Sequence, residues 1–312
     1  VGLDVDTERV CELCSRKIEL YAGMIRRNWN SPLLLRNKLG KIYEGIEPAG
    51  NHRDYTKWEE LKKVSDHLGK KGELKEEEWR DYISGLIDGE GWIGERTITI
   101  ELDESEASLA YKIKKKIGSG SVIKEKRGVR YTIRKREGLL KVMNMINGRL
   151  RTKKRVDQLL RWKEGEIVVK PIREDENLDN YWLCGFAEAE GSFVISVADS
   201  KKIKKSVRLE FTIKQKEERE VLQRIKEKMG GGNVRWDNSE EIYCYKSSGM
   251  KTAYEVIRYF DKYRLMSRKY TRYLKYRKVY RMLTRGEHLE EKGIKKIESI
   301  RSKGSSETIR ST

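Results

Sequence analysis

Hydrophobic and polar residues alternate with a period of two in several short segments of the chain. In residues 207–213, Val, Leu, Phe and Ile alternate with Arg, Glu and Thr, and residues 129–133 show the same pattern with Val, Tyr and Ile. This period predicts strands with one buried face and one solvated face. Helices are expected between these strands and after them, at residues 105–117, 217–229, 137–162 and 250–283.

Two parts of the chain resemble each other. Residues 79–91 read WRDYISGLIDGEG and residues 179–191 read DNYWLCGFAEAEG, each ending in the glycine that commonly stops a helix. Downstream, IKKKIGSGSV at 113–122 matches IKEKMGGGNV at 225–234. Several aligned blocks in the same order indicate a duplication. Each copy is predicted to fold as helix–strand–strand–helix–strand–strand–helix, an α/β (α+β) architecture.

The duplication divides the chain into four parts. Repeat 1 is expected at residues 79–170 and repeat 2 at 171–285. Residues 1–78 are expected to form a helical extension. Residues 286–312 are polar and Ser-rich near the end, so a partly disordered tail is expected there.

Glycine-rich pieces occur once in each repeat, at residues 118–120 and 230–232. Each follows a predicted helix and precedes a predicted strand. A phosphate-binding loop has the reverse order, from strand to helix. These pieces are therefore interpreted as helix-to-strand turns.

The chain has a net charge of +19, and almost all of the excess lies in the repeats. Residues 79–285 contain 48 Lys and Arg against 30 Asp and Glu, whereas residues 1–78 are balanced. A positive surplus over a compact region favours a polyanion as partner.

The remaining composition bears on compartment and origin. The four cysteines do not suggest a disulfide framework, and Cys11 and Cys14, half a zinc motif without a second pair, fit an N-terminal helix better. No apolar window is long enough to cross a bilayer, so a soluble, intracellular protein without a membrane partner is expected. Only three Gln among many Lys, Arg and Glu resembles usage in hyperthermophiles. An archaeal cytoplasm or an organelle is the expected location.

Small residues mark one face of each duplicated short helix. Gly85 and Gly89 are four positions apart, and the second helix has Gly and Ala at the matching places. This spacing lets two helix backbones approach closely. Pairing the helices would bring Glu90 and Glu190 together, and two close carboxylates repel unless cations lie between them. Mg²⁺, a hard cation that prefers oxygen ligands, suits such a site.

The sequences ISGLIDGEG and LCGFAEAEG resemble the motif of the LAGLIDADG family, and residues 79–285 follow the order of that family's repeats. Two copies in one chain resemble its single-chain, pseudo-symmetric members. The resemblance implies a saddle of two antiparallel sheets. It also implies a monomeric, intron-encoded homing endonuclease that makes a double-strand break in a long, asymmetric DNA target, leaving short 3′ overhangs.

The resemblance assigns the metal ligands to the last acidic residue of each motif and to the carbonyl before it. The implied set is Glu90, Glu190, Gly89 and Ala189. Mg²⁺ is expected as the cofactor, Mn²⁺ as a substitute, and Ca²⁺ as an ion that supports binding without cutting. The family consensus has Asp where this chain has Glu, which has the same charge and a longer reach. Asp88 and Glu188 fill the earlier acidic position and are expected to cap or pair structurally.

Family members also carry a polar residue and a basic residue near the metals. Gln215 matches the polar position, and its counterpart in repeat 1 is Leu102, so the two half-sites are expected to differ in efficiency. The candidates for the basic positions are Lys154 and Lys269, with Lys153 and Arg268 as close rivals. Any of these could instead contact a phosphate.

The solvated strand faces offer residues suited to the major groove, where Arg can recognise guanine and Thr can contact bases or methyl groups. The residues expected to contact DNA are Arg96, Arg130, Thr132, Arg134, Arg136, Arg208, Thr212, Lys214, Arg235 and Lys246. The alternative for one such strand is a solvated face without a partner. Two matching repeats with a positive surplus favour DNA.

Two other functions remain open on the same scaffold. One is a maturase that binds intron RNA and assists splicing. The other is a DNA-binding regulator that has lost catalysis. Retention of both Glu90 and Glu190 argues against a purely degenerate version of either.

Overall fold

The computed structural model describes residues 62–70, 72–126, 128–162, 168–171, 178–199 and 205–302, all within one compact unit spanning residues 56–312. The expected helical extension at 1–78 therefore lies mostly outside the described residues, together with Cys11 and Cys14. Residues 62–70 and 72–75 form neither helix nor strand. None of the helices in the described ranges has the length and apolar character that crossing a bilayer requires.

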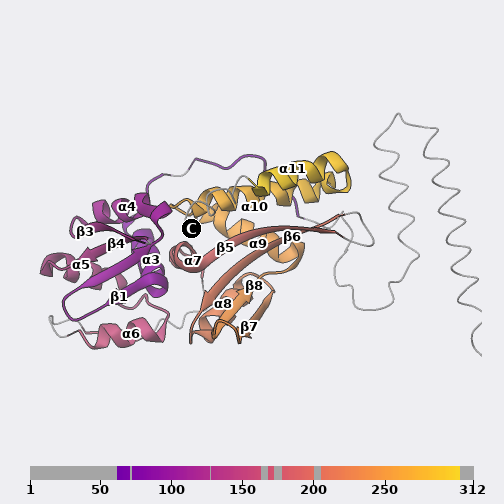
Figure 1. Ribbon diagram of the computed structural model, residues 1–312. Helices are drawn as coiled ribbons and strands as arrows, with labels where there is room; N and C mark the ends of the chain where they lie inside the picture. Colours follow the sequence, from indigo (N-terminus) through magenta and orange to yellow (C-terminus); the bar gives the residue numbers. More distant parts are fainter. Residues whose placement is uncertain are drawn as a thin grey trace, which may run out of the picture. The chain divides into compact units, whose positions relative to one another are not determined.

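Repeat 1 begins with the motif helix and continues through a four-stranded sheet (Figure 1). Its elements are α3 (Glu76–Glu90), β1 (Gly91–Ile93), β2 (Ile98–Leu102), η2 (Glu104–Glu106), α4 (Ala107–Ile117), β3 (Ser121–Glu125), β4 (Gly128–Ile133), α5 (Arg136–Ile146) and α6 (Lys153–Leu160).

Repeat 2 has the same order and is followed by one more helix. Its elements are α7 (Trp182–Glu190), β5 (Gly191–Asp199), β6 (Lys205–Gln215), α8 (Arg219–Lys228), β7 (Asn233–Asp237), β8 (Ile242–Lys246), α9 (Gly249–Lys262) and α10 (Lys269–Thr284). The additional elements are η3 (Glu287–Leu289) and α11 (Glu291–Ser302).

Each repeat forms one antiparallel sheet with helices on one face. The strand orders are β1-β2-β4-β3 and β5-β6-β8-β7, and the pairings repeat with the same topology. The predicted period of two is confirmed in β6, where Leu209, Phe211 and Ile213 are buried. In the part of the core that repeat 2 supplies, Phe193 packs edge-on against Phe260 of α9 and Tyr273 of α10, with ring centroids 5.2 and 5.5 Å apart. The duplicated α+β architecture is confirmed.

The glycine-rich pieces are turns, as predicted. Gly118 ends α4 in the left-handed region at φ +78°, and Gly120 follows at φ +98°. Gly230 and Gly232 of repeat 2 also have positive φ. Residues with a Cβ are strained in this region, so glycine permits the sharp reversal from helix to strand.

The long closing helices predicted at 137–162 and 250–283 are wrong in one respect, because each is two helices. Residues 147–152 separate α5 from α6, and residues 263–268 separate α9 from α10. Gly148, at φ +74°, turns the chain in the first break. The polar groups freed at both breaks are bound by buried carboxylates of the motif helices, a long-range contact that local pattern does not contain.

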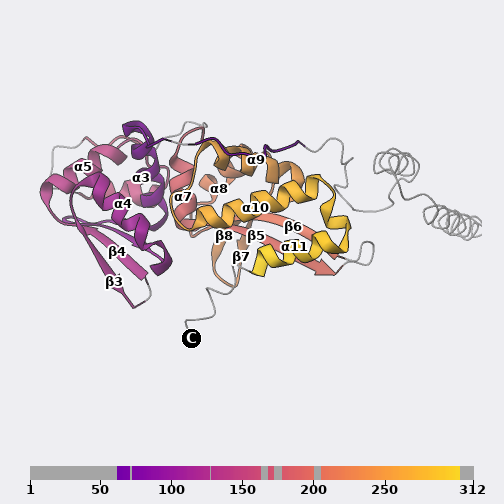
Figure 2. The ribbon, with the colours of Figure 1, turned by 90° about the horizontal axis from the view of Figure 1, so that it is seen from above.

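The segment expected to be a polar, partly disordered tail contains η3 and α11. Helix α11 packs beside α10 (Figure 2), with Ile297 buried completely and Ile294 nearly so. These residues are three positions apart and form an apolar stripe along one side of the helix. Residues 303–312 lie outside the described part of the chain.

Candidate active site

The two motif helices, α3 and α7, lie side by side between the two sheets (Figures 1 and 2). A Cβ added at Gly85 would stand 1.9 Å from the backbone oxygen of Trp182, and one added at Gly185 would stand 1.9 Å from that of Tyr82. These distances leave no room for a side chain, so the two backbones touch directly. The close approach predicted from the small residues is therefore present and symmetric.

The carboxylates of Glu90 and Glu190 lie at the same end of this helix pair. A Cβ added at Gly89 would stand 2.3 Å from the Cβ of Ala189 and 3.3 Å from the Cγ of Glu190. Burial, and then the negative charge of Glu90, raise the pKa of Glu190 to about 7. Removal from water also raises the pKa of Glu90. The structure thus brings together the two carboxylates that the sequence singled out, with the unfavourable electrostatics expected of a cation site.

The donor set at this end of the helix pair consists of oxygen atoms. Among the described residues, no group of three or more His, Cys, Asp or Glu side chains is placed to hold a metal ion. A cation here would use the two carboxylates together with main-chain carbonyls and water. That donor set fits Mg²⁺, which is bound through few carboxylates and keeps several waters.

Two basic side chains reach the carbonyls that precede the carboxylates. Nζ of Lys269 donates to the carbonyl of Ala189 at 2.7 Å. In repeat 1 the equivalent contact comes from Arg155, whose Nη2 donates to the carbonyl of Gly89 at 2.9 Å. Lys269 is placed as expected, whereas Lys154 is exposed and makes no such contact. In repeat 1 this contact is therefore made by Arg155 and not by Lys154.

The difference between the expected residue, Lys154, and the observed one, Arg155, has a simple origin. The sequence blocks align Lys154 with Lys269, but one position along a helix turns a side chain by about 100°. Arg155 is buried, and its longer side chain also donates from Nε to the carbonyl of Ile87 at 2.9 Å. The rival Lys153 is exposed and pairs with Asp157 at 2.9 Å. The sequence did contain a signal for this contact. Arg155 follows Lys154 directly, and a guanidinium can donate to two carbonyls at once.

Asp88 is structural, as expected. Its buried carboxylate accepts hydrogen bonds from the backbone N–H of Arg151 at 2.8 Å and from the hydroxyl of Thr152 at 2.5 Å. It also accepts one from Nε1 of Trp182, in the other motif helix, at 2.7 Å. Asp88 therefore fixes the break before α6 and joins the two repeats.

Glu188 has the same role in repeat 2. It accepts hydrogen bonds from the backbone N–H and the hydroxyl of Ser267, and from the hydroxyl of Tyr82 in α3 at 3.3 Å. Burial raises the pKa of Glu188, against the hydrogen bonds from Ser267 and from the backbone of Met266, which lower it. The two carboxylates thus form a pseudo-symmetric pair that holds the chain breaks next to the motif helices.

The two halves of the site differ at one position. Gly91 pairs with Ile100 in repeat 1 and Gly191 with Ile213 in repeat 2, so Leu102 and Gln215 are structural equivalents. Nε2 of Gln215 donates to Oε1 of Glu190 at 2.8 Å. Leucine has no donor, so the Glu90 half lacks this hydrogen bond.

The comparison with known proteins agrees with this geometry. The family model described as LAGLIDADG endonuclease matches residues 83–164 and 183–280. The chain belongs to the LAGLIDADG endonuclease family. The family resemblance proposed from the two motifs is therefore confirmed.

Similar proteins include two whose names refer to introns. An uncharacterised cox1 intron-2 37.2 kDa protein of Schizosaccharomyces pombe is 36% identical over 250 residues, 76% of each chain. A probable intron-encoded endonuclease 4 of Neurospora crassa is 27% identical over 267 residues, 80% of this chain and 47% of that protein. Both come from fungi, so the archaeal origin suggested by amino-acid usage gains no support.

Solved structures share the LAGLIDADG fold. The crystal structure of meganuclease I-SmaMI bound to uncleaveable DNA superposes with a TM-score of 0.61. It is 19% identical and covers 72% of this chain and 97% of that chain. At this identity the match establishes the fold, including the saddle of two sheets expected from the family.

In this LAGLIDADG chain, repeat 2 carries a basic sheet face opposite its core. Strand register places five of the expected residues on that face: Arg208, Thr212, Lys214, Arg235 and Lys246. Lys214 pairs with Glu240 at 2.5 Å, and Lys246 pairs with Glu210 at 2.9 Å. Arg208 and Arg235 are exposed, and within the described part of the chain their side chains form no ion pair, so the face keeps a positive surplus.

The corresponding face of repeat 1 differs from expectation. Thr132 lies in the central strand β4 between Thr99 and Ser121, and only 4% of it is exposed, so the solvated position predicted for it is wrong. Arg130 lies on this face but forms ion pairs with Glu101 and Glu125, each at 2.9 Å.

Three further Arg residues of repeat 1 are exposed but lie outside strands. Arg96 is in the turn between β1 and β2, Arg134 follows β4, and Arg136 begins α5. The strands predicted from the alternation of hydrophobic and polar residues are therefore longer than the strands observed. Sequence reasoning also missed Trp92 and Ile123, which register places on the same face and which are each 49% exposed.

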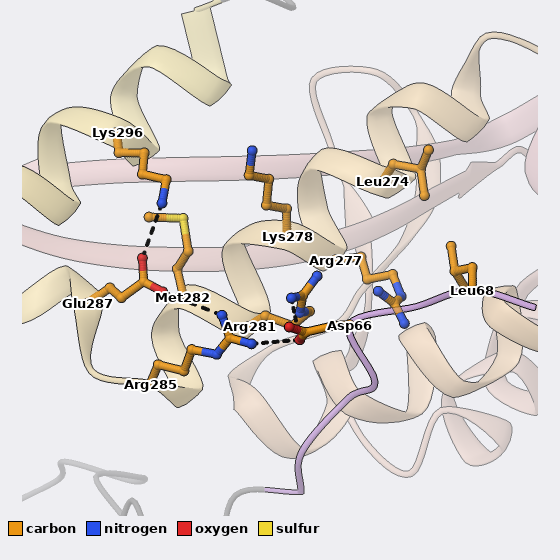
Figure 3. Close-up of a pocket in the computed structure, with 10 residues that line it drawn as sticks. All are labelled: Asp66, Leu68, Leu274, Arg277, Lys278, Arg281, Met282, Arg285, Glu287 and Lys296. Atoms are coloured by element: carbon orange, nitrogen blue, oxygen red, sulfur yellow. Dashed lines mark hydrogen bonds and ion pairs between the residues drawn. The ribbon is translucent and has the colours of Figure 1, made fainter.

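A cavity of about 500 Å³ lies along α10 (Figure 3). Several of its cations have partners within the protein: Arg281 and Arg285 both bind Asp66, and Lys296 lies 3.5 Å from Glu287. None of the site residues above lines it. The cavity is therefore lined by a different set of residues from those at the end of the motif helices.

Proposed function

We propose that this protein hydrolyses one phosphodiester bond in each strand of a long, asymmetric duplex DNA target, using divalent metal held between Glu90 and Glu190. The observation that carries the proposal is the pair of mutually repelling carboxylates at the joined ends of two motif helices. A protein gains nothing in stability from placing two such groups together. The arrangement is explained if it binds cations.

Four groups on the two helices would hold the metal: the carboxylates of Glu90 and Glu190 and the carbonyls of Gly89 and Ala189. When bound, a divalent metal would activate water and stabilise charge on phosphate oxygens. Mg²⁺ is the proposed ion, with Mn²⁺ as a substitute, because both are hard cations that prefer oxygen ligands. Ca²⁺ is expected to support DNA binding without cleavage.

The neighbouring side chains have separate tasks. Gln215 holds the carboxylate of Glu190 in one orientation through its hydrogen bond. Arg155 and Lys269 donate to the carbonyls before the carboxylates and lie where positive charge can stabilise a phosphate. In this proposal both basic groups turn toward the scissile phosphates when DNA is bound.

The proposed substrate is duplex DNA along the two sheets. Repeat 2 offers exposed Arg and Lys on one sheet face, and a flat antiparallel ribbon fits the major groove. Similar solved structures include meganucleases and a homing endonuclease bound to DNA. One chain supplies both Glu90 and Glu190, so a monomer is sufficient for two cuts.

The test is cleavage of a library of long DNA duplexes by purified protein, in Mg²⁺ and separately in Ca²⁺. Discrete double-strand breaks in Mg²⁺ only are expected, and they would identify the target. Glu90→Gln should abolish or strongly impair double-strand cutting and leave binding in Ca²⁺ intact. Glu137→Gln, on the exposed start of α5, is the matched control and should cut normally.

The alternative function gives a different result. A maturase would bind structured RNA in a salt-dependent manner and leave the duplex library intact. Normal double-strand cutting by Glu90→Gln would show that the metal site lies elsewhere.

A further inference from the structure

Two carboxylates outside the motif helices form a pseudo-symmetric pair. Glu106 immediately precedes α4, and Glu218 immediately precedes α8, the equivalent helix of the other repeat. This is the N-cap position, where acidic side chains usually accept hydrogen bonds from their own helix. Neither side chain caps its own helix. Each reaches the opposite repeat instead.

Glu218 of repeat 2 contacts the start of α6 in repeat 1. Its Oε1 accepts a hydrogen bond from the backbone N–H of Lys154 at 3.2 Å. That N–H belongs to the first turn of α6, where helical N–H groups have no partner within the helix. Arg155, the next residue, donates to the carbonyl of Gly89.

Glu106 of repeat 1 makes the corresponding contact with repeat 2. Only 5% of it is exposed, and its Oε1 lies 3.3 Å from Oγ of Ser267. The same Oγ accepts a hydrogen bond from the backbone N–H of Lys269, the first residue of α10, at 3.0 Å. Burial raises the pKa of Glu106, and the charge of Lys269 is the largest influence that lowers it, consistent with a short separation.

We propose that Glu106 and Glu218 are positioning residues, each of which holds the first turn of the opposite repeat's basic helix so that Lys269 or Arg155 reaches the metal-binding end of its own repeat. Glu218 does so directly, by accepting from a free N–H in the first turn of α6, and its charge complements the positive end of the helix dipole. Glu106 does so through Ser267, whose Oγ lies between Glu106 and the N–H of Lys269. The same Oγ also donates to Glu188. Each half-site thus depends on a residue of the other repeat. The inference rests on the proposed endonuclease function.

The competing explanation is that these carboxylates only join the two repeats. In that case their removal would loosen the whole molecule and slow both cuts equally. A positioning role instead predicts opposite strand preferences, because Glu218 acts on the Glu90 half and Glu106 on the Glu190 half.

The cleavage test uses the duplex that the wild-type protein selects from the library, labelled separately on each strand. Glu218→Ala should slow cutting of one strand about tenfold more than the other, and Glu106→Ala should slow the opposite strand, in line with loss of a charged hydrogen bond. Glu218→Gln and Glu106→Gln keep the volume and an acceptor atom, so they should fold even where the Ala variants do not, and should show smaller preferences of the same sign. Glu220→Ala, exposed on α8, should match wild type.

Hydrogen–deuterium exchange tests the contacts without catalysis. Glu218→Ala should speed exchange in residues 153–157 alone, and Glu106→Ala should speed it in residues 267–272 alone. Uniform changes in exchange, or equal slowing of both strands, would overturn the inference. If the wild-type protein cuts no duplex, the endonuclease proposal fails, and the exchange experiment still decides whether the cross-repeat contacts hold these helices.

Discussion

At the residue scale, the proton balance of Glu190 links the fold to metal binding. Its pKa of about 7 lies above the ordinary value of 4.5, so the folded state favours the protonated form. A raised pKa contributes stability below pH 4.5 and loses that contribution as the pH rises through 7. The ionised site is therefore strained until a cation enters.

Glu190→Gln should make the metal-free protein more stable at pH 8, because it removes the ionised form. The expected gain is about 1–3 kcal/mol above pH 7, shrinking to nothing near pH 4.5. Thermal unfolding across this range, with Glu137→Gln as control, measures it. A variant less stable than wild type at pH 8 would contradict the assigned electrostatics.

The affinity for metal should also become weaker as the pH is lowered. Binding requires ionised carboxylates, so the affinity for Mg²⁺ is expected to weaken as the pH drops below 7, with proton release on binding at pH 6.5. Isothermal titration in two buffers of different ionisation enthalpy measures the released protons. Affinity independent of pH between 6 and 8 would exclude Glu190 as a ligand.

The Leu102 and Gln215 difference predicts unequal cutting. Gln215 fixes Glu190, whereas Leu102 leaves Glu90 without that hydrogen bond. Leu102→Gln should raise the slower strand's rate several-fold, and Gln215→Leu should lower the faster strand's rate by about tenfold. Time courses that resolve nicked from linear DNA give both rates. Equal rates in the wild-type protein would refute this asymmetry.

At the element scale, the motif helices depend on backbone contact. A methyl group at Gly185 would stand 1.9 Å from the carbonyl oxygen of Tyr82, so α3 and α7 would have to separate. Gly185→Ala should cost roughly 3 kcal/mol or more, at the upper end of overpacking effects. Gly72→Ala, with no atom within 4 Å, is the matched control. Denaturant unfolding of both variants measures the difference; equal stabilities would mean that the helices are not packed this closely.

The helix breaks are also decided at this scale. Asp88 and Glu188 each bind polar groups that end one helix and begin the next. The residues next to Asp88 and Glu188 in the sequence indicate only an acidic residue within an apolar helix, and they do not indicate its hydrogen-bond partners. The partners, Arg151 and Ser267, lie far along the chain, and the bonds exist only after each repeat closes on its motif helix.

At the scale of the whole molecule, the excess positive charge is unequally distributed over the two sheets. Arg208 and Arg235 stand on the repeat 2 face, whereas Arg130 of repeat 1 is held by Glu101 and Glu125. The half-site bound by repeat 2 should therefore contribute more to the salt dependence of DNA binding.

Arg208→Ala and Arg235→Ala should each reduce the slope of log Kd against log salt by up to about 1, if each contacts one phosphate. Arg130→Ala should change it less, because its charge is already balanced. Fluorescence anisotropy with the target duplex in Ca²⁺ measures all three slopes. A larger effect at Arg130 would mean that DNA displaces its acidic partners.

The sequence by itself determined the duplication, most of the strand faces, the close helix pair and the two glutamates that lie together at its end. These follow from patterns a few residues long, because a period of two or a spacing of four fixes which side chains share a face. Tertiary structure alone decided that Arg155 and not Lys154 reaches the site, that Thr132 is buried, and that Glu106 and Glu218 cross between repeats. Those outcomes depend on the angles at which distant elements pack, and such angles leave no local pattern in the chain.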